Sequence, residues 1–182
     1  ILGVHSFLSI KAQRDELLSQ AEIYANKLSE TIRNSTHLSM LENRSDQTHN
    51  IINTIAQEPG LREIRIFNKE GRIIFSSQKE FIGQMVDKNA EACYACHTAN
   101  EPLEKLPMED RTRIYDSPQD SSRILGIINP IYNEKSCWEA DCHVHPADQK
   151  VLGVLDVKLS LKDLDAQIAN SEFRSIMLAV IA

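Results

Sequence analysis

Hydrophobic and small side chains recur at alternating steps of four and three residues between positions 17 and 38. This spacing places them on one side of a long helix. The helix is expected to pack on its own domain through this stripe, and a second interpretation places the stripe against the helix of a partner subunit. The stripe consists of Leu17, Ala21, Tyr24, Leu28, Thr31, Ser35 and Leu38.

A second helix is predicted directly after the first. Ser45 or Asp46 is its expected N-cap, because short polar side chains accept hydrogen bonds from the first turn of a helix. Pro59 and Gly60 end it, since proline cannot continue a helix and glycine favours its termination. Its buried side is expected to consist of Ile51, Ile52, Ile55 and Ala56.

Residues 62–77 predict a β-hairpin. Charged residues alternate with Ile64 and Ile66 between Arg62 and Phe67, a pattern typical of a half-buried strand. Asn68-Lys69-Glu70-Gly71 has the composition of a turn, after which Arg72 to Ser77 forms the returning strand. Three further strands are expected near Arg111–Tyr115, at Arg123–Tyr132 and at Lys150–Leu161.

The pattern as a whole predicts an α+β fold with a five-stranded antiparallel sheet between helices. The last segment, Lys162 to Ala182, carries Leu164, Ile168 and Phe173 at helical spacing and is expected to leave the sheet as a helix. No internal repeat and no proline-rich or glycine-rich linker divides the chain.

Both ends of the chain are apolar. Only His5, Ser6 and Ser9 interrupt the segment Ile1 to Ile10, and Ile176 to Ala182 is apolar throughout. Neither run reaches the roughly 20 apolar residues that a bilayer-spanning helix needs. We interpret them as the remaining parts of two membrane helices, and the alternative is that two short terminal helices pack on each other.

Composition and charge exclude several classes of protein. The chain has 182 residues, of which 42% are hydrophobic and 25% charged, so collagen-like and wholly disordered chains are excluded. Its 20 basic and 26 acidic residues give a net charge of −6, and the basic residues are scattered. Nucleic acid is therefore not an expected partner.

The four cysteines fall in two clusters, and in each a histidine directly follows the second cysteine. In the first cluster, Cys93-Tyr94-Ala95-Cys96-His97, the spacing is that of a c-type haem attachment signature. Two nearby thiols can add to the two vinyl groups of the porphyrin, and the adjacent imidazole then lies beside the iron. We therefore expect haem c attached at Cys93 and Cys96, with His97 as an axial ligand.

The second cluster, Cys137-Trp138-Glu139-Ala140-Asp141-Cys142-His143, has four residues between its cysteines instead of two. Multihaem cytochromes also use this longer spacing, so a second haem c is expected at Cys137 and Cys142, with His143 on its iron. Three alternatives remain open for the cysteines: disulfide bonds, a tetrahedral zinc site and an iron–sulfur cluster. Disulfides or an all-cysteine metal site would leave His97 and His143 unexplained.

The second axial ligand of each iron is a separate question. His145 lies only two residues from His143, too few for the chain to pass around the porphyrin edge, so His145 would serve the other haem. His49, on the second helix, is the other leading candidate. Further candidates are His37, Met40, Met85 and Met108, and the aromatic residues Tyr94, Tyr132 and Trp138 could pack on a haem face.

Residues 61–161 resemble the extracytoplasmic PAS-like or Cache-like sensor domains of bacterial signal transducers that carry covalent c-type haem. The resemblance is carried by Ile64–Ile73, the Cys93 cluster, Asn129–Glu134 and Val151–Val157. Sensors of this type usually have one attachment motif, so the second cluster departs from the pattern. The fold that the resemblance implies is a PAS/Cache-like five-stranded antiparallel sheet with long N-terminal helices and a C-terminal exit helix.

The resemblance also implies an organisation and a location. The chain would consist of the end of a membrane helix (1–10), a membrane-proximal helical region (11–58), the haem-binding sensor domain (59–161) and an exit helix running into a second membrane helix (162–182). The domain would face the periplasm from the inner membrane, form a homodimer, and pass a signal to a histidine kinase or a chemotaxis-receptor module.

The expected function is a periplasmic sensor domain that binds haem c and responds to redox state or to a small ligand. One alternative is a membrane-anchored c-type cytochrome that transfers electrons with a donor and an acceptor. Another is a haem-free Cache module that binds a small ligand and uses its cysteines for zinc or disulfides. The sequence contains no nucleophile elbow, phosphate-binding glycine loop or metalloprotease motif, so this fragment is not expected to be an enzyme.

Overall fold

A five-stranded antiparallel sheet forms the centre of the structure, a computed structural model that describes residues 2–86, 106–139 and 145–181. The strand order is β2-β1-β5-β4-β3, so the last strand along the chain lies in the middle of the sheet. The strands are β1 (Leu61–Asn68), β2 (Ile73–Ser76), β3 (Thr112–Asp116), β4 (Arg123–Tyr132) and β5 (Val151–Ser160). The predicted α+β class, the hairpin and the three later strands are confirmed.

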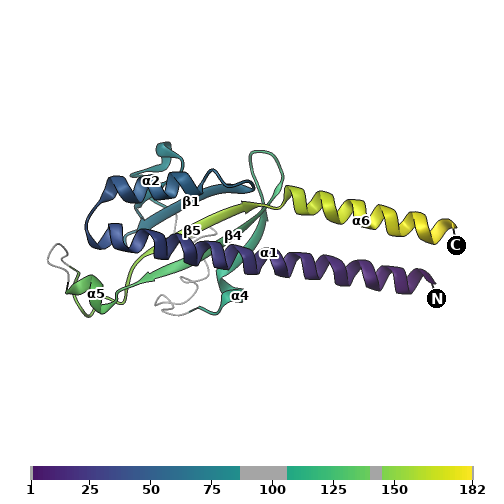
Figure 1. Ribbon diagram of the computed structural model, residues 1–182, viewed down its shortest axis with the longest axis horizontal. Coiled ribbons are helices and arrows are strands. Elements are labelled where there is room, and N and C mark those ends of the chain that lie inside the picture. Colours follow the sequence, from purple (N-terminus) through teal and green to yellow (C-terminus); the bar gives the residue numbers. More distant parts are fainter. Residues whose placement is uncertain (1, 87–105, 140–144, 182) are drawn as a thin grey trace.

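The helices α1 (Leu2–Leu41) and α2 (Ser45–Ile55) lie along one face of this sheet (Figure 1). The core between them contains the side chains that point from the strands toward the helices. These side chains occupy alternate positions along each strand, because successive side chains of a strand point to opposite faces of the sheet. They include Ile64, Ile66, Leu125, Ile127, Leu155 and Val157, which meet Ala25, Ile32 and Ile52 of the helices.

The buried face of α1 is shifted by one residue from the predicted stripe. The prediction that the stripe packs on the domain is wrong for Tyr24 and Leu38, which are 53% and 62% exposed. The buried residues are instead Ala25, Ser29, Ile32, Thr36 and Ser39. Their hydroxyl groups do not oppose burial, because Ser29, Thr36 and Ser39 each donate a hydrogen bond of 2.8–2.9 Å to a carbonyl oxygen of the same helix.

Helix α1 ends at a turn in which Asn43 adopts a left-handed conformation, with φ of 52°. The amide of Asn43 donates to the carbonyl of Met40 at 3.1 Å, and the amide of Arg44 donates to that of Ser39 at 2.8 Å. This pattern is a Schellman motif, and asparagine tolerates the left-handed position better than most residues. The turn fixes the angle at which α2 begins.

Helix α2 begins at Ser45, and Arg44 occupies the N-cap position without a side-chain hydrogen bond to the helix. The predicted capping by Ser45 or Asp46 is therefore wrong, because the Schellman turn at the end of α1 already determines where α2 starts. The predicted buried side is confirmed for Ile52, which is fully buried, and Ile51, Ile55 and Ala56 are partly buried.

The C-terminal helix α6 (Lys162–Ile181) follows β5 after Leu161 and runs beside α1, so both termini lie at one end of the molecule (Figure 1). Ser171 Oγ and Gln13 Oε1 are 2.7 Å apart between the two helices. The guanidinium of Arg123 in β4 binds the carboxylate of Asp165 in the first turn of α6. No helix within the described residues combines the length and the apolar character needed to cross a bilayer.

Candidate functional site

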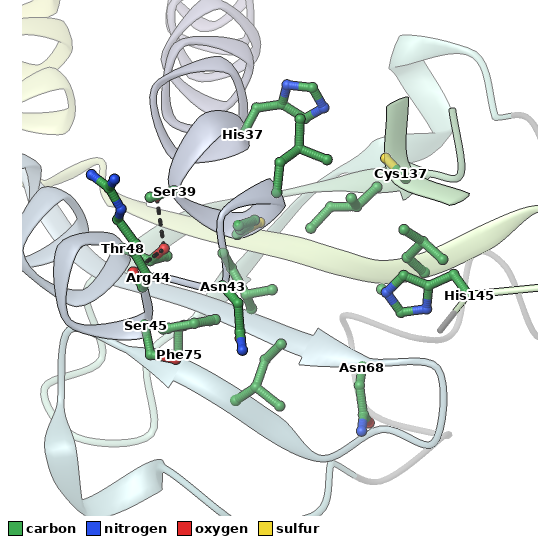
Figure 2. Close-up of a pocket in the computed structure, with 17 residues that line it drawn as sticks. His37, Ser39, Asn43, Arg44, Ser45, Thr48, Asn68, Phe75, Cys137 and His145 are labelled. Atoms are coloured by element: carbon green, nitrogen blue, oxygen red, sulfur yellow. Dashed lines mark hydrogen bonds between the residues drawn. The ribbon is translucent and has the colours of Figure 1, made fainter. Parts of the chain in front are cut away.

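A cavity of about 260 Å³ lies between the end of α1, the start of α2, the β1–β2 hairpin and the short helix α5 (Lys135–Trp138). In Figure 1, α5 lies at the end of the molecule opposite the two termini. The walls of the cavity are largely apolar. They include Met40, Ile66, Ile74, Phe75, Ile131 and Leu152, and Figure 2 shows the polar residues around them.

His37 reaches this cavity from the last turns of α1. Its Nε2 atom is buried and has no hydrogen-bond partner among the described residues. Burying a nitrogen without a partner is costly, and an ordered water or a bound group commonly satisfies such an atom. His37 therefore contributes to the cavity wall, while protein atoms cover its Nε2.

Cys137 lines the cavity from the side of α5, and its side chain is buried as a free thiol. Its amide donates to the carbonyl oxygen of Glu134 at 2.7 Å, which fixes the single turn of α5. His145 enters the same cavity from the segment that follows, and in the view of Figure 2 Cys137 lies between His37 and His145.

Asn133 holds together the two ends of the segment that carries Cys137 and His145. Its side-chain Nδ2 donates to the carbonyl oxygens of Pro146 and Gln149 at 3.0 and 2.7 Å. Its backbone N–H donates to the carbonyl oxygen of Lys150 at 2.9 Å. Asn133 belongs to the segment Asn129–Glu134 that carries the resemblance, and no role was predicted for it. An asparagine between a strand and a cysteine cluster was the available signal.

The structure brings together some of the predicted site residues and separates others. His37, Met40, Cys137 and His145 line one cavity. His49 does not line it and instead packs on Phe75, with ring centroids 4.7 Å apart. Met85 and Met108 are 56% and 38% exposed. The remaining predicted residues, Cys93, Cys96, His97, Cys142 and His143, lie outside the described residues.

The described side chains around the cavity do not form a site for a bare metal ion. No group of three histidine, cysteine or acidic side chains in the described part of the chain is close enough to hold a metal ion. A haem iron already has four porphyrin nitrogens and needs only one or two protein ligands. Among the described residues, Cys137 offers the cavity a thiol of the kind that forms a thioether link, and the walls are apolar.

A second, polar cavity of about 290 Å³ lies on the opposite face of the sheet from α1 and α2. Its lining includes Arg62, Arg65 and Lys158 with Glu63, so its charge is positive on balance. Glu63 Oε2 accepts from Lys158 Nζ at 2.8 Å, whereas Glu63 Oε1 is buried and has no hydrogen-bond partner among the described residues. Arg62 and Arg65 are bound to Asp120 and Asp156, so the unsatisfied Glu63 Oε1 acceptor suits a small ligand that carries a hydrogen-bond donor.

Asp156 organises the same face beside the polar cavity. Its fully buried carboxylate accepts from Arg65 Nη2 at 2.6 Å and from Arg113 Nη2 at 2.7 Å. Burial by itself would raise the pKa of Asp156, but Arg113 and Arg65 outweigh this effect and hold the pKa below its usual value. The carboxylate is therefore charged at neutral pH.

Arg113 reaches Asp156 only because residue 126 is a glycine. Arg113 in β3 pairs with Gly126 in β4, and its guanidinium lies over that glycine on the way to β5. A Cβ atom at position 126 would lie 2.7 Å from Arg113 Cζ. Gly126 thus permits an ion pair that spans three strands of the sheet.

Comparison with known proteins identifies the class of fold. The structure is similar to the E. coli DcuS sensor domain, with a TM-score of 0.52 and 16% identity over 86% of this chain and 97% of that domain. No family model matches the sequence, and no curated protein matches it. The chain therefore has the PAS/Cache-like sensor fold that the sequence predicted.

Two further solved structures are less similar. The periplasmic domain of RsbU from Chlamydia trachomatis has a TM-score of 0.43 and 16% identity, covering 90% of this chain and 56% of that one. An extracellular ligand binding receptor from Desulfohalobium retbaense has a TM-score of 0.44 and 14% identity, covering 88% of this chain and 27% of that one.

Proposed function

We propose that this chain is the periplasmic sensor domain of a transmembrane signalling protein, a histidine kinase in the first instance, and that it carries covalently attached haem c. The proposal rests on the agreement between the two cysteine motifs in the sequence and the residues that line the apolar cavity. Each cysteine cluster ends in the Cys-His pair of a haem attachment signature, and the described cysteine of the second cluster lines a cavity with His37 and His145.

The proposed haem supplies an iron whose ligands and charge change on reduction or on binding of a small ligand. The chain's own residues would hold the group and respond to that change. Cys137 would provide one thioether link, the apolar walls would exclude water from the macrocycle, and Asn133 would fix the segment after β4 that bears the cluster.

The arrangement of the long helices supports a connection to the membrane. Helices α1 and α6 extend from the sheet to the same end of the molecule (Figure 1). We propose that residues 1–10 and 162–182 lead to membrane helices on both sides of the domain at residues 59–161, with residues 11–58 as the membrane-proximal helical region. The remainder of the protein would then supply the catalytic output, and this fragment would be its non-catalytic input.

Haem attachment is tested on protein matured by a bacterial cytochrome c assembly system. We expect covalent haem on a denaturing gel and two haems per chain by pyridine haemochrome quantitation, because the sequence contains two clusters. Cys93→Ala/Cys96→Ala and Cys137→Ala/Cys142→Ala should each remove one haem. The control is Ser136→Ala, beside Cys137 but exposed, which should leave the ratio unchanged. A chain without haem, or double variants with the parental ratio, would contradict the proposal.

The polar cavity favours a second candidate function, that of a module binding a small ligand with an amino group. The observation in its favour is Glu63 Oε1, which is buried without a hydrogen-bond partner among the described residues and can accept from a donor on the ligand. In a panel of amino acids and small amines screened by thermal denaturation, at least one compound should then raise the melting temperature of the parent protein, and Gln78→Ala in the cavity wall should weaken the effect. Exposed Gln47→Ala, far from this cavity in sequence and absent from its lining, is the control.

A further inference from the structure

The arginines in and beside the polar cavity form ion pairs whose charges can be counted. Arg62 Nη2 lies 3.0 Å from Asp120 Oδ2, and Arg65 Nη2 lies 2.6 Å from Asp156 Oδ2. Arg113 shares the second carboxylate, with its Nη2 2.7 Å from Asp156 Oδ1. In this group of described residues three guanidinium groups bind two carboxylates, so one positive charge is in excess.

Glu63 forms its ion pair through only one of its two carboxylate oxygens. Its Oε2 accepts from Lys158 Nζ at 2.8 Å, so these two charges cancel. Its Oε1 has no hydrogen-bond partner among the described residues, although the side chain is only 7% exposed. Because a buried acceptor without a partner is costly, a ligand that donates an N–H or O–H to Glu63 removes that cost.

The charge count restricts which donor fits beside Glu63. A simple ammonium ion would add a further positive charge to a group that already has one in excess, and like charges repel each other strongly where water is partly excluded. A compound whose ammonium group is accompanied by a carboxylate adds no net charge. Its ammonium group also forms a stronger, charge-assisted hydrogen bond to Glu63 than a neutral hydroxyl group would.

Arg62 can bind the accompanying carboxylate without releasing Asp120. A guanidinium carries five N–H donors, and the hydrogen bonds from Arg62 to Ser117 and Asp120 both leave from Nη2. The Arg62 side chain is 35% exposed, so a ligand can reach its Nε and Nη1 groups. The register of β1 shifts between Leu61 and Glu63, and the neighbouring Arg62 and Glu63 both line the cavity.

We propose that the polar cavity binds an α-amino acid, whose ammonium group donates to Glu63 Oε1 and whose carboxylate accepts from Arg62. The proposal rests on the second candidate function given above and names its class of ligand. The volume of about 290 Å³ is close to the lower end of the usual range for small-molecule sites, about 300–1,000 Å³, which suits a ligand of this size. Apolar surface for its side chain comes from Phe81, Pro118 and Ile124.

The test compares matched compounds on the parent protein. The amino acids of proteins are first screened by thermal denaturation, and the best binder is then compared by calorimetry with its decarboxylated amine and its deaminated acid. We expect both of these compounds to bind at least about tenfold more weakly, because each lacks one charge-assisted hydrogen bond. An amine or an acid that binds as tightly as the amino acid would overturn the proposal.

Two variants separate the two ends of the ligand. Glu63→Gln removes the charge that binds the ammonium group, and Arg62→Gln removes the guanidinium at a more exposed position, where folding is less at risk. Each should weaken binding of the amino acid about tenfold, whereas Arg62→Gln should not weaken binding of the amine. Lys69→Gln is the control, since Lys69 is an exposed cation on the β1–β2 turn and is absent from the cavity lining.

The possible failures are distinguishable. Unchanged affinity for the amino acid in both Glu63→Gln and Arg62→Gln would overturn the proposal, as would an equal loss in Lys69→Gln. Binding of simple amines alone would refute the α-amino acid but leave the second candidate function in place. If neither amino acids nor amines bind the parent protein, that candidate function itself is refuted.

Discussion

One carboxylate, that of Asp156, fixes the polar face of the sheet. It is fully buried in the central strand β5 and binds guanidinium groups from β1 and β3. Breaking a buried ion pair by removing one partner leaves charges without compensation, and this typically costs about 3–5 kcal/mol. Asp156 therefore stabilises the sheet from which both the polar cavity and α6 extend.

At the residue scale we predict that Asp156→Asn lowers the free energy of unfolding by about 3–5 kcal/mol at pH 7. The folded pKa of Asp156 is depressed, so its contribution is present above the unfolded pKa of about 4 and is lost as the pH falls through the folded pKa. The difference between parent and variant should shrink below about pH 4.

Urea unfolding of the haem-loaded protein between neutral and acidic pH measures this difference. The matched control is Asp163→Asn, an exposed carboxylate in the first turn of α6, which should have a small effect at every pH. A difference between Asp156→Asn and the parent that is as large in acid as at pH 7 would show that the carboxylate does not act through its charge.

At the scale of elements, helix α1 has a buried face and an exposed face that carries apolar side chains. The face with Ser29, Ile32 and Thr36 packs on the domain, whereas Tyr24 and Leu38 of the predicted stripe are exposed. Exposed apolar side chains at helical spacing are available to a helix of a partner subunit. We propose that a second copy of this chain covers the stripe, which is the partner-subunit interpretation of the sequence.

We predict that Leu38→Glu and Tyr24→Glu convert a dimer into a monomer, because a carboxylate in a helix–helix interface is desolvated without a partner. Light scattering coupled to size-exclusion chromatography measures the mass. Asn34→Glu, exposed on the same helix but outside the stripe, should leave the mass unchanged. A monomeric parent protein, or a dimer that survives both substitutions, would exclude this surface.

At the scale of the whole molecule, the question is whether the proposed haem signals or only relays electrons. β5 lies in the centre of the sheet and leads through Leu161 directly into α6, whose first turn is bound to β4 through Arg123 and Asp165. A change in the sheet would thus reach α6, which lies beside α1 (Figure 1).

We predict that oxidised and reduced haem-loaded protein differ in amide hydrogen exchange at the end of α1 and along α6. The β3–β4 turn at Ser117–Ser122 serves as the internal reference, because its backbone hydrogen bonds are local and it does not line the apolar cavity. Equal exchange in α1 and α6 in both redox states would favour the alternative of a passive electron carrier over a sensor.

The sequence predicted those parts of the fold that depend on local pattern. Alternation gave the hairpin of β1 and β2 with its turn at Gly71, where φ is 88°, and the long strands β4 and β5. The spacing of Leu164 and Ile168 gave α6. These elements follow from which side chains can face a core at a given period, and that information is contained in neighbouring residues.

The faces of α1 could not be predicted in this way. Serine and threonine appear polar in sequence, yet Ser29, Thr36 and Ser39 are buried because their hydroxyls bond to the helix backbone. Ser29 also accepts a hydrogen bond at 3.2 Å from the buried Asn129 of β4, a residue 100 positions away. A polar pair of this kind is recognisable only once the two elements are packed together.

For the candidate site, the sequence by itself determined the chemistry: two cysteine clusters, each with its adjacent histidine, and a set of histidines and methionines able to bind iron. Only the tertiary structure decided that His37, Met40, Cys137 and His145 meet at one cavity while His49 packs against Phe75. The chemical reactivity of a residue depends on its side chain, so it can be read from the sequence. Proximity depends on how α1, α5 and the central sheet pack, and no local pattern encodes that arrangement.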